Sequence, residues 1–273
     1  MKVSVITVCY NAVQGIENTI QSVISQTYPN IEYIVIDGGS VDGTLDVIKK
    51  YQDKISYMVS EPDKGIYDAM NKGLKAVTGE WVNFLNAGDV YYNSQSIENV
   101  FSCEIPYEVD VVYGYQVHIF NYGEFVRRRL PLSFFKKGMP FGHESSFVRS
   151  VVMKRYGFDT DYSIAADYHF FFHLYALGKK FQFVDVLVAV FDSSEGVSSS
   201  DKTALLTLYE TSKINGLGTY QFIKSWIRTY AAIKTKSMLR RISPSFVENR
   251  QRHKREKNSE YVPLSVFMSN RHA

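Results

Sequence analysis

The first 90 residues alternate between short apolar runs and amphipathic stretches, and this alternation limits the fold more than any other feature of the chain. Apolar and β-branched runs at 3–9, 31–36 and 81–85 are typical of strands that are buried on both faces. Residues 16–26 and 66–76, which lie between these runs, carry apolar side chains at helical spacing. Strands that alternate with helices form a parallel sheet with right-handed crossovers, so the sequence predicts an α/β fold.

The rhythm of the sequence changes after Asp89. Runs at 110–119 and 123–129 indicate antiparallel strands, an aromatic-rich helix is expected over 166–177, and a last strand over 181–190. The fold expected from both halves is a mostly parallel central sheet that is flanked by helices and extended by antiparallel strands.

The last part of the chain is helical in pattern and rich in Lys and Arg. Residues 250–258 are polar enough to predict a solvated tail. The sequence therefore predicts a main domain at 1–200, with a nucleotide-binding half at 1–90 and an acceptor half at 91–200, and a basic helical C-terminal extension at 201–273.

Composition narrows the range of partners. The 31 Lys and Arg and 28 Asp and Glu leave a net charge of +3, which gives no reason to expect binding to nucleic acid. Two cysteines, Cys9 and Cys103, form neither a disulfide framework nor a metal-ligand spacing, and a reducing cytosol is the simplest interpretation. Since no signal peptide precedes Val3 and no apolar run approaches the roughly 20 residues of a membrane-spanning helix, we expect a cytoplasmic protein.

Polar residues follow the second predicted strand, where it ends at Asp37. In open parallel sheets, ligands bind outside the carboxyl ends of the strands. Two glycines follow Asp37, and glycine lets a backbone approach a ligand closely. We therefore expect Asp37 to accept hydrogen bonds from a base or a ribose, whereas Asp42 is expected to cap the next helix.

A second carboxylate, Asp89, follows the strand at 81–85 and lies at the same edge of the predicted sheet. One carboxylate suits Mg²⁺ or Mn²⁺, because these ions take oxygen ligands and obtain the rest of their shell from water and substrate phosphates. Such an ion would neutralise the charge on a departing diphosphate. The alternative for Asp89 is an ordinary turn residue after Gly88.

Two residues of the second half are candidates for chemistry. Asp167 lies at the start of the aromatic helix, where it is either an N-cap or a general base that removes a proton from an acceptor hydroxyl. His143 lies in a loop between predicted strands, where it either contacts substrate or phosphate or has a structural polar role.

Four segments follow one another in a specific order and spacing: TVCYN at 7–11, DGGSVDGT at 37–44, EPDKGIYDAMNKG at 61–73 and FLNAGD at 84–89. In this respect the chain resembles the family 2 glycosyltransferases. The resemblance is dense over the first 90 residues and thinner to about residue 195. It implies a GT-A fold, a nucleotide-sugar donor and transfer with inversion at the anomeric carbon.

The resemblance also implies roles for the nucleotide-binding residues. Thr7 and Tyr10 would flank the base, and Asp37 would bind the uracil or the ribose of a UDP-sugar. The turn formed by Asp63 and Lys64 is similar to the family's loop near the base.

For the reacting groups, the resemblance implies that Asp89 holds the divalent metal and that Asp167 is the catalytic base. It places His143 beside the donor diphosphate and the acceptor. The chain departs from the family pattern at Asn86 and Gly88, because this segment often contains two or three acids. Asp89 is therefore the single carboxylate of the segment.

Two other functions compete with the transferase. A nucleotidyltransferase would show a Gly-rich basic loop after the first strand, and residues 11–21 hold one glycine, Gly15, and no Lys or Arg. A nonenzymatic nucleotide-sugar-binding subunit is the second alternative, which Asn86 and Gly88 would suit. We expect the transferase, with a glycan or a polyprenyl-diphosphate-linked acceptor of bacterial surface polysaccharide biosynthesis.

The segment from Tyr220 to Arg241 mixes aromatic and aliphatic residues with Lys and Arg. Such a segment suits peripheral association with an anionic membrane, here the inner face of the cell membrane. A helical pair packed on the domain with a solvated basic face is the alternative.

Overall fold

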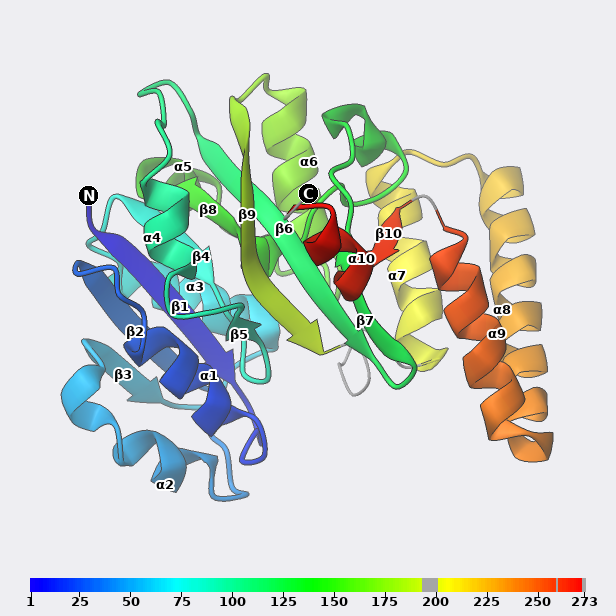
Figure 1. The fold of residues 1–273 in the computed structure, drawn as a ribbon, viewed down its shortest axis with the longest axis horizontal. Coiled ribbons are helices and arrows are strands. Elements are labelled where there is room, and N and C mark those ends of the chain that lie inside the picture. The colour runs from blue at the N-terminus through cyan, green and yellow to red at the C-terminus, as the bar shows by residue number, and fades with distance from the viewer. Residues whose placement is uncertain (193–200, 259, 272–273) are drawn as a thin grey trace. The chain divides into compact units, whose positions relative to one another are not determined.

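The computed structural model describes residues 1–192, 201–258 and 260–271 (Figure 1). The chain divides into two compact units. The first unit comprises 1–116 and 141–191, and the second comprises 117–140 and 192–273. The predicted division into a transferase domain and a C-terminal extension concerns which parts of the chain fold independently, and it stays a prediction.

Four parallel strands form the first half of the first unit, in the order β4, β1, β2, β3. These strands are β1 (Val3–Cys9), β2 (Ile31–Asp37), β3 (Tyr57–Ser60) and β4 (Trp81–Phe84). The helices that connect them are α1 (Ile16–Ile24), α2 (Thr44–Lys49) and α3 (Ile66–Ala76), with a 3₁₀ turn at Gln52–Lys54. The predicted α/β alternation of the first 90 residues is therefore confirmed.

Antiparallel strands extend this sheet. The strand β8 (Ser146–Arg149) pairs with β4 and with β6 (Val111–Phe120), and β9 (Phe181–Asp192) pairs with β5 (Val90–Tyr91) and β6. The accompanying helices are α4 (Ser96–Phe101), α5 (Ser150–Tyr156) and α6 (Ala166–Ala176), with a 3₁₀ turn at His143–Ser145. The short strand β5 and the helices α4 and α5 have too few residues to give a clear period, and the sequence prediction missed them.

The core of the first unit lies between the sheet and its helices. Trp81 is fully buried at the start of β4, and the guanidinium of Arg149 lies 4.4 Å from its ring centre. Helix α3 approaches β1 so closely that a Cβ on Gly73 would lie 2.6 Å from Ile6, which only glycine permits. This packing fixes the strand ends that carry the candidate site.

The second unit combines three antiparallel strand segments with helices. The end of β6 pairs with β7 (Gly123–Arg127), which pairs with β10 (Tyr261–Pro263). Its helices are α7 (Asp201–Ile214), α8 (Thr219–Ile242), α9 (Pro244–Glu256) and α10 (Leu264–Ser269), with a 3₁₀ turn at Leu132–Lys136. Among the described residues, no helix combines the length and the apolarity that crossing a bilayer requires.

Two expectations for the C-terminal region are wrong. The predicted solvated tail at 250–258 lies mostly in α9, which begins with Pro244 at its first position and Ser243 accepting a hydrogen bond from Phe246 N–H. The strand that begins at Phe181 is also not the last, because β10 follows it. Both errors have one cause: Val247 and Tyr261 are buried, but too few apolar residues surround them to give a period.

Glu32 on β2 is a buried carboxylate whose contacts predict a pH-dependent contribution to stability. Burial raises the pKa of Glu32. The ammonium of Lys2 at 2.7 Å, the Ser4 hydroxyl and the Thr78 N–H and hydroxyl lower this pKa by more than burial raises it, to about 2. Because the folded pKa lies below the unfolded value, the stabilisation is complete above about pH 5 and is lost as the pH falls toward 2.

We therefore expect Glu32→Gln to lower the free energy of unfolding by about 2–3 kcal/mol at pH 7, with a difference that shrinks as the pH is lowered. Urea unfolding of both proteins at pH 7 and pH 3 measures this. The exposed Glu108, changed to Gln, is the matched control. An equal loss at both pH values would contradict the assigned cause.

Candidate active site

The carboxyl ends of β1, β2 and β4 meet at one edge of the sheet in the first unit. Cys9 pairs with Asp37, the N–H of Gly38 donates to Cys9 carbonyl oxygen at 2.9 Å, and the N–H of Ala87 donates to Val8 carbonyl oxygen at 3.1 Å. The three loops that follow these strands are therefore neighbours, as parallel strands require.

Asp37 is fully buried, and both of its carboxylate oxygens are engaged. They accept hydrogen bonds from the Ser40 N–H at 3.0 Å, the Ser60 hydroxyl at 2.6 Å and the Ser40 hydroxyl. Burial raises the pKa of Asp37, but these donors lower it more, so its net shift is downward and the group is ionised at neutral pH. In this arrangement Asp37 holds the loop that follows β2.

Tyr10 and Asp63 lie on either side of Gly38. A Cβ on Gly38 would lie 2.3 Å from the Asp63 carboxylate and 3.3 Å from the Tyr10 ring, so a side chain there would displace both. The Tyr10 ring is 63% exposed and offers a stacking surface. Asp63 accepts from the Gly65 N–H at 2.8 Å, and the neighbouring Lys64 is exposed. Tyr10, Asp63 and Asp37 are thus brought together by the fold.

Thr7 is not part of this exposed group. Its side chain is fully buried, and its hydroxyl donates to the Leu85 carbonyl oxygen at 2.8 Å while accepting from the Tyr33 hydroxyl at 3.1 Å. The role predicted for Thr7 beside a base stays a prediction, and no contact in the structure supports it.

Asp42 does not occupy the N-cap position of α2, which is Gly43. Its carboxylate instead accepts from the N–H of Thr44 at 3.0 Å and from the N–H of Val13 at 3.1 Å. Asp42 therefore ties the loop after β1 to the start of α2, and the expectation that it is the N-cap of this helix is wrong by one position.

Asp89 ends the turn that follows β4, with its N–H donating to the Asn86 carbonyl oxygen at 3.0 Å. Gly88 has a φ of +101°, which favours glycine at this point of the turn. Asp89 is buried, and its backbone carbonyl accepts from the Thr19 hydroxyl at 2.8 Å. No cluster of three or more His, Cys, Asp or Glu suited to a metal occurs in the described parts of the chain, and the role of Asp89 as a metal ligand stays a prediction.

His143 lies at the centre of a charged network. Its Nδ1 is 3.3 Å from Glu144 Oε1 and 3.5 Å from Asp167 Oδ2. Burial lowers the pKa of His143, but Glu144, Asp167 and Asp89 raise it more, to about 9. His143 is therefore an imidazolium ion at neutral pH, in which both ring nitrogens donate.

The other ring nitrogen of His143, Nε2, lies 3.2 Å from the side-chain amide of Asn86. Because an imidazolium donates from Nε2, Asn86 must face it with its amide oxygen, and a carboxamide can be turned to do so. The NH₂ group of Asn86 then occupies the buried amide position that has no partner among the described residues.

Asp167 lies in the first turn of α6, two positions after the N-cap residue Ala165. Its Oδ1 accepts from the Tyr67 hydroxyl at 3.0 Å, while Oδ2 faces His143. Burial raises the pKa of Asp167, but His143, the Tyr168 N–H and Tyr67 lower it below its usual range. The side chain is 22% exposed, so an ionised carboxylate remains accessible from solvent.

Glu144, Gln116 and Asn83 hold the segment that carries His143. Glu144 is buried and accepts from Gln116 Nε2 at 2.6 Å, and Asn83 on β4 donates to the carbonyl oxygens of Glu144 at 3.0 Å and Ser146 at 2.8 Å. Gly142 permits this packing, because a Cβ there would lie 2.0 Å from the Gln116 amide.

Sequence reasoning did not assign Tyr67, Gln116 or Asn83 to the site, and it considered Glu144 only as a replacement for Asp167 as the base. Tyr67 lies within the EPDKGIYDAMNKG segment, and its position there was the single signal that pointed to it. The other three are separated from one another by long stretches of chain, and no spacing in the sequence relates them.

The fold of the first unit, with its strand ends carrying polar loops, defines a GT-A fold, and solved glycosyltransferases share it. TarS of Staphylococcus aureus in complex with UDP-GlcNAc aligns with a TM-score of 0.59 and 20% identity over 79% of this chain and 70% of that chain. The mannosyltransferase PcManGT of Pyrobaculum calidifontis in complex with GDP-Man and Mn²⁺ aligns with a TM-score of 0.60 and 19% identity over 85% of this chain and 69% of that chain. The predicted fold class is confirmed.

The chain belongs to glycosyl transferase family 2, whose family model matches residues 4–178. An uncharacterized glycosyltransferase of Mycobacterium tuberculosis is 36% identical over 177 residues, which is 62% of this chain and 66% of that protein. TuaG of Bacillus subtilis, a glycosyltransferase named for teichuronic acid biosynthesis, is 40% identical over 90 residues, 32% of this chain and 36% of TuaG. The chain thus spans just under two thirds of the mycobacterial relative and about a third of TuaG. The family resemblance stated from the sequence is confirmed.

Proposed function

We propose that this protein is an inverting glycosyltransferase that moves a sugar from a nucleotide-sugar, most simply a UDP-sugar, to a hydroxyl of a glycan or lipid-linked acceptor. The observation that carries the proposal is the pairing of Asp167 with the His143 cation in the same network as Asp89. The names of relatives such as TuaG support a place in surface polysaccharide biosynthesis.

In this proposal Asp167 is the general base. Its carboxylate takes the proton of the acceptor hydroxyl, and the freed oxygen forms a bond to the anomeric carbon as the bond to the diphosphate breaks. A single in-line displacement inverts that carbon. The Tyr67 hydroxyl donates to Oδ1 of Asp167, and the His143 ring faces Oδ2. Because both oxygens have a partner, the carboxylate is oriented before the acceptor binds.

The donor would bind along the edge formed by the loops after β1 and β2. Tyr10 would stack on the base, and Asp63 and Lys64 would border it, while Asp37 would act by holding the loop or by binding uracil or ribose. UDP-GlcNAc in TarS and GDP-Man in PcManGT show that the nucleotide differs within this fold, so the choice of nucleotide is open to test.

The residues present fit a divalent cation held mainly by its substrate. Asp89 supplies one carboxylate, and Mg²⁺ or Mn²⁺ bound to a diphosphate needs only one or two from the protein. Such an ion would neutralise the charge that develops on the departing diphosphate.

A donor screen tests the proposed function. We expect one class among UDP-, GDP- and dTDP-sugars to raise the melting temperature with Mn²⁺ present, and the matching donor to be consumed when an acceptor is added. NMR of the product should show an inverted anomeric centre. Donor binding without turnover across acceptor classes would favour the nonenzymatic sugar-binding subunit, and release of pyrophosphate would favour the nucleotidyltransferase.

Peripheral membrane association is supported by one face of α8. Tyr220, Ile223 and Ile227 lie at helical spacing and are 77%, 49% and 56% exposed, with Lys224 and Arg228 beside them. Such a face suits an anionic bilayer surface, where each nearby cation contributes about 1 kcal/mol. Removal of the C-terminal region would also remove β10, so substitutions in the full chain are the better test.

We expect the double variant Ile223→Ser/Ile227→Ser to sediment less with anionic vesicles than the wild type, because apolar insertion is lost while the charge is kept. Co-sedimentation with phosphatidylglycerol vesicles at low and high salt measures this. Val151, which is 74% exposed on α5, changed to Ser is the control. Equal pelleting of the double variant and the wild type would refute association through this face.

A further inference from the structure

The small net charge of the chain conceals two units of opposite charge. The first unit holds 12 Lys and Arg and 20 Asp and Glu, whereas the second holds 19 Lys and Arg and 8 Asp and Glu. The acidic unit contains the candidate active site. The excess cations of the second unit are not part of that site, so an anionic ligand or surface that binds them is a separate matter.

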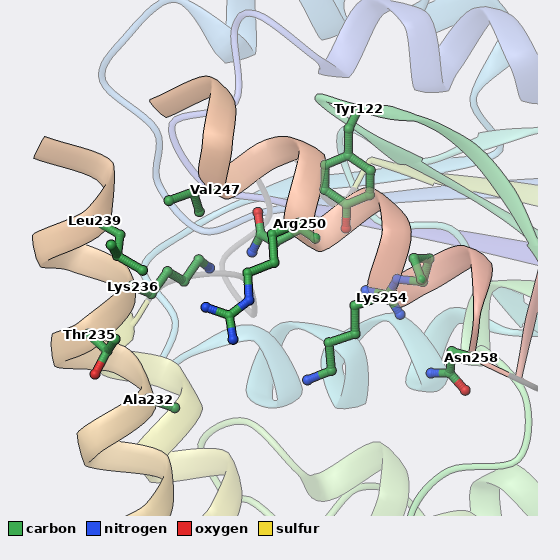
Figure 2. A pocket seen from close by; sticks show the side chains of 11 residues that line it. Tyr122, Ala232, Thr235, Lys236, Leu239, Val247, Arg250, Lys254 and Asn258 are labelled. Carbon is green, nitrogen blue, oxygen red and sulfur yellow. The ribbon is translucent and has the colours of Figure 1, made fainter. Parts of the chain in front are cut away.

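A pocket of about 510 Å³ lies between α8 and α9 in the second unit, closed on one side by Tyr122 in the turn between β6 and β7 (Figure 2). Its lining residues recur every three or four positions along each helix. On α8 and α9 and just beyond, they are Ala232, Thr235, Lys236, Leu239, Val247, Arg250, Gln251, Lys254, Arg255 and Asn258. None of the described lining residues is Asp or Glu.

Three cations of α9 line the pocket, and none of them forms an ion pair with a carboxylate of the described residues. The guanidinium of Arg255 lies 4.4 Å from the ring centre of Phe120 and 4.2 Å from that of Tyr261, so two aromatic faces hold it. Arg250 and Lys254 make no ion pair with any described residue, and both extend into the space between the helices (Figure 2). Arg252, outside the pocket, is instead paired with Glu256 at 3.0 Å.

The pocket also has an apolar side. Ala232 and Leu239 on α8 and the buried Val247 on α9 are its apolar lining residues. Neutral donors, the Tyr122 hydroxyl and the amides of Gln251 and Asn258, complete the polar side. A ligand that fits this surface carries concentrated negative charge at one end and hydrocarbon at the other.

We propose that this pocket binds a diphosphate group joined to an aliphatic chain. A diphosphate carries two to three negative charges, which Arg250, Lys254, Arg255 and Lys236 can neutralise, and Arg binds phosphate oxygens in a bidentate manner. The volume of about 510 Å³ is in the range of small-ligand sites. The site lies outside the proposed donor site. Lipid-linked acceptors carry such a group, whereas a membrane phospholipid carries a single phosphodiester.

Calorimetric titration of the full chain with geranyl diphosphate and with inorganic pyrophosphate tests the proposal. We expect both to bind, geranyl diphosphate more tightly because its hydrocarbon reaches Leu239 and Val247. The double variant Arg250→Gln/Lys254→Gln should lose roughly tenfold or more in affinity for both, since charge-assisted hydrogen bonds to phosphate are among the stronger ones.

The control is Arg240→Gln/Lys257→Gln, which removes one Arg and one Lys that are exposed and lie outside the pocket lining. This variant should bind geranyl diphosphate like the wild type. Equal weakening in both variants would mean nonspecific charge attraction, and unchanged affinity in Arg250→Gln/Lys254→Gln would place the ligand elsewhere; either result overturns the proposal.

Vesicles test whether the pocket selects a diphosphate over a phospholipid headgroup. Geranyl diphosphate that stays bound in the presence of phosphatidylglycerol vesicles supports the proposal. Displacement by phosphatidylglycerol vesicles but not by neutral ones would show that a single phosphodiester competes for the pocket, and it would overturn the diphosphate assignment. Because no donor or transfer step is involved, a failure here leaves the proposed transferase standing, and a failed transfer assay leaves this site standing.

Discussion

The Asp167→Asn protein is expected to transfer sugar at least about 10²-fold more slowly than the wild type, with nearly unchanged stability and UDP binding. Asn has almost the same shape and can still accept a hydrogen bond from the Tyr67 hydroxyl, but it has no basic oxygen to take the acceptor proton. Initial rates under saturating donor and acceptor measure the loss, and thermal unfolding and UDP titration measure what is retained.

The exposed Asp161, six residues earlier, changed to Asn is the matched control and should transfer at the wild-type rate. Transfer by Asp167→Asn within a few-fold of the wild type would exclude Asp167 as the base. Glu144 would then be the next candidate, although it is buried and already accepts from Gln116. If Asp167→Asn and Asp161→Asn lost the same amount of stability and of transfer rate, the loss would be caused by the removal of a negative charge and not by the removal of a catalytic base.

The second large effect is expected for Asp89→Ala, which should abolish the gain in UDP binding that Mn²⁺ or Mg²⁺ gives the wild type. Transfer should fall by roughly 10²-fold, because a metal ion at a departing diphosphate contributes several kcal/mol. The turn itself should persist, since Gly88 and the backbone groups of Asp89 form its contacts. Thermal shift with UDP, with metal and with chelator, measures the binding term.

The control is Asp46→Ala, which removes an exposed carboxylate from α2. This variant should keep the gain in UDP binding that the metal gives the wild type. Wild-type protein that UDP stabilises equally with metal and with chelator would contradict a metal ligand at Asp89. In that case the His143 cation would be the group left to meet the diphosphate.

Local pattern was sufficient for much of the fold. The limits of α3 at Ile66 and Ala76 and of β1 at Val3 and Cys9 agree with the sequence prediction, because buried strands and amphipathic helices have distinct periods. The same reasoning missed β10 and interpreted 250–258, most of which lies in α9, as a solvated tail, because burial there depends on single residues such as Val247 and Tyr261.

The candidate site was only partly predictable. The sequence identified Asp37, Asp89 and Asp167 by their positions at strand ends and at a helix start, and the structure brings Asp167 to His143. It did not predict that Asp37 is enclosed by Ser40 and Ser60, or that Thr7 is buried. Exposure and hydrogen-bond partners depend on neighbours that are distant in sequence.

The sequence by itself determined the α/β alternation, the acids Asp37 and Asp89 that follow the second and fourth strands, and the family, because these depend on residues within a few positions of one another. The tertiary structure alone decided the charge state of His143, since Glu144, Asp167 and Asp89 surround it only after β4, the 143–146 turn and α6 have packed. It also decided the cationic pocket, which forms when α8 and α9 place residues from both helices around one space. Coulombic and packing energies depend on distances in space, and the order of residues along the chain does not give those distances.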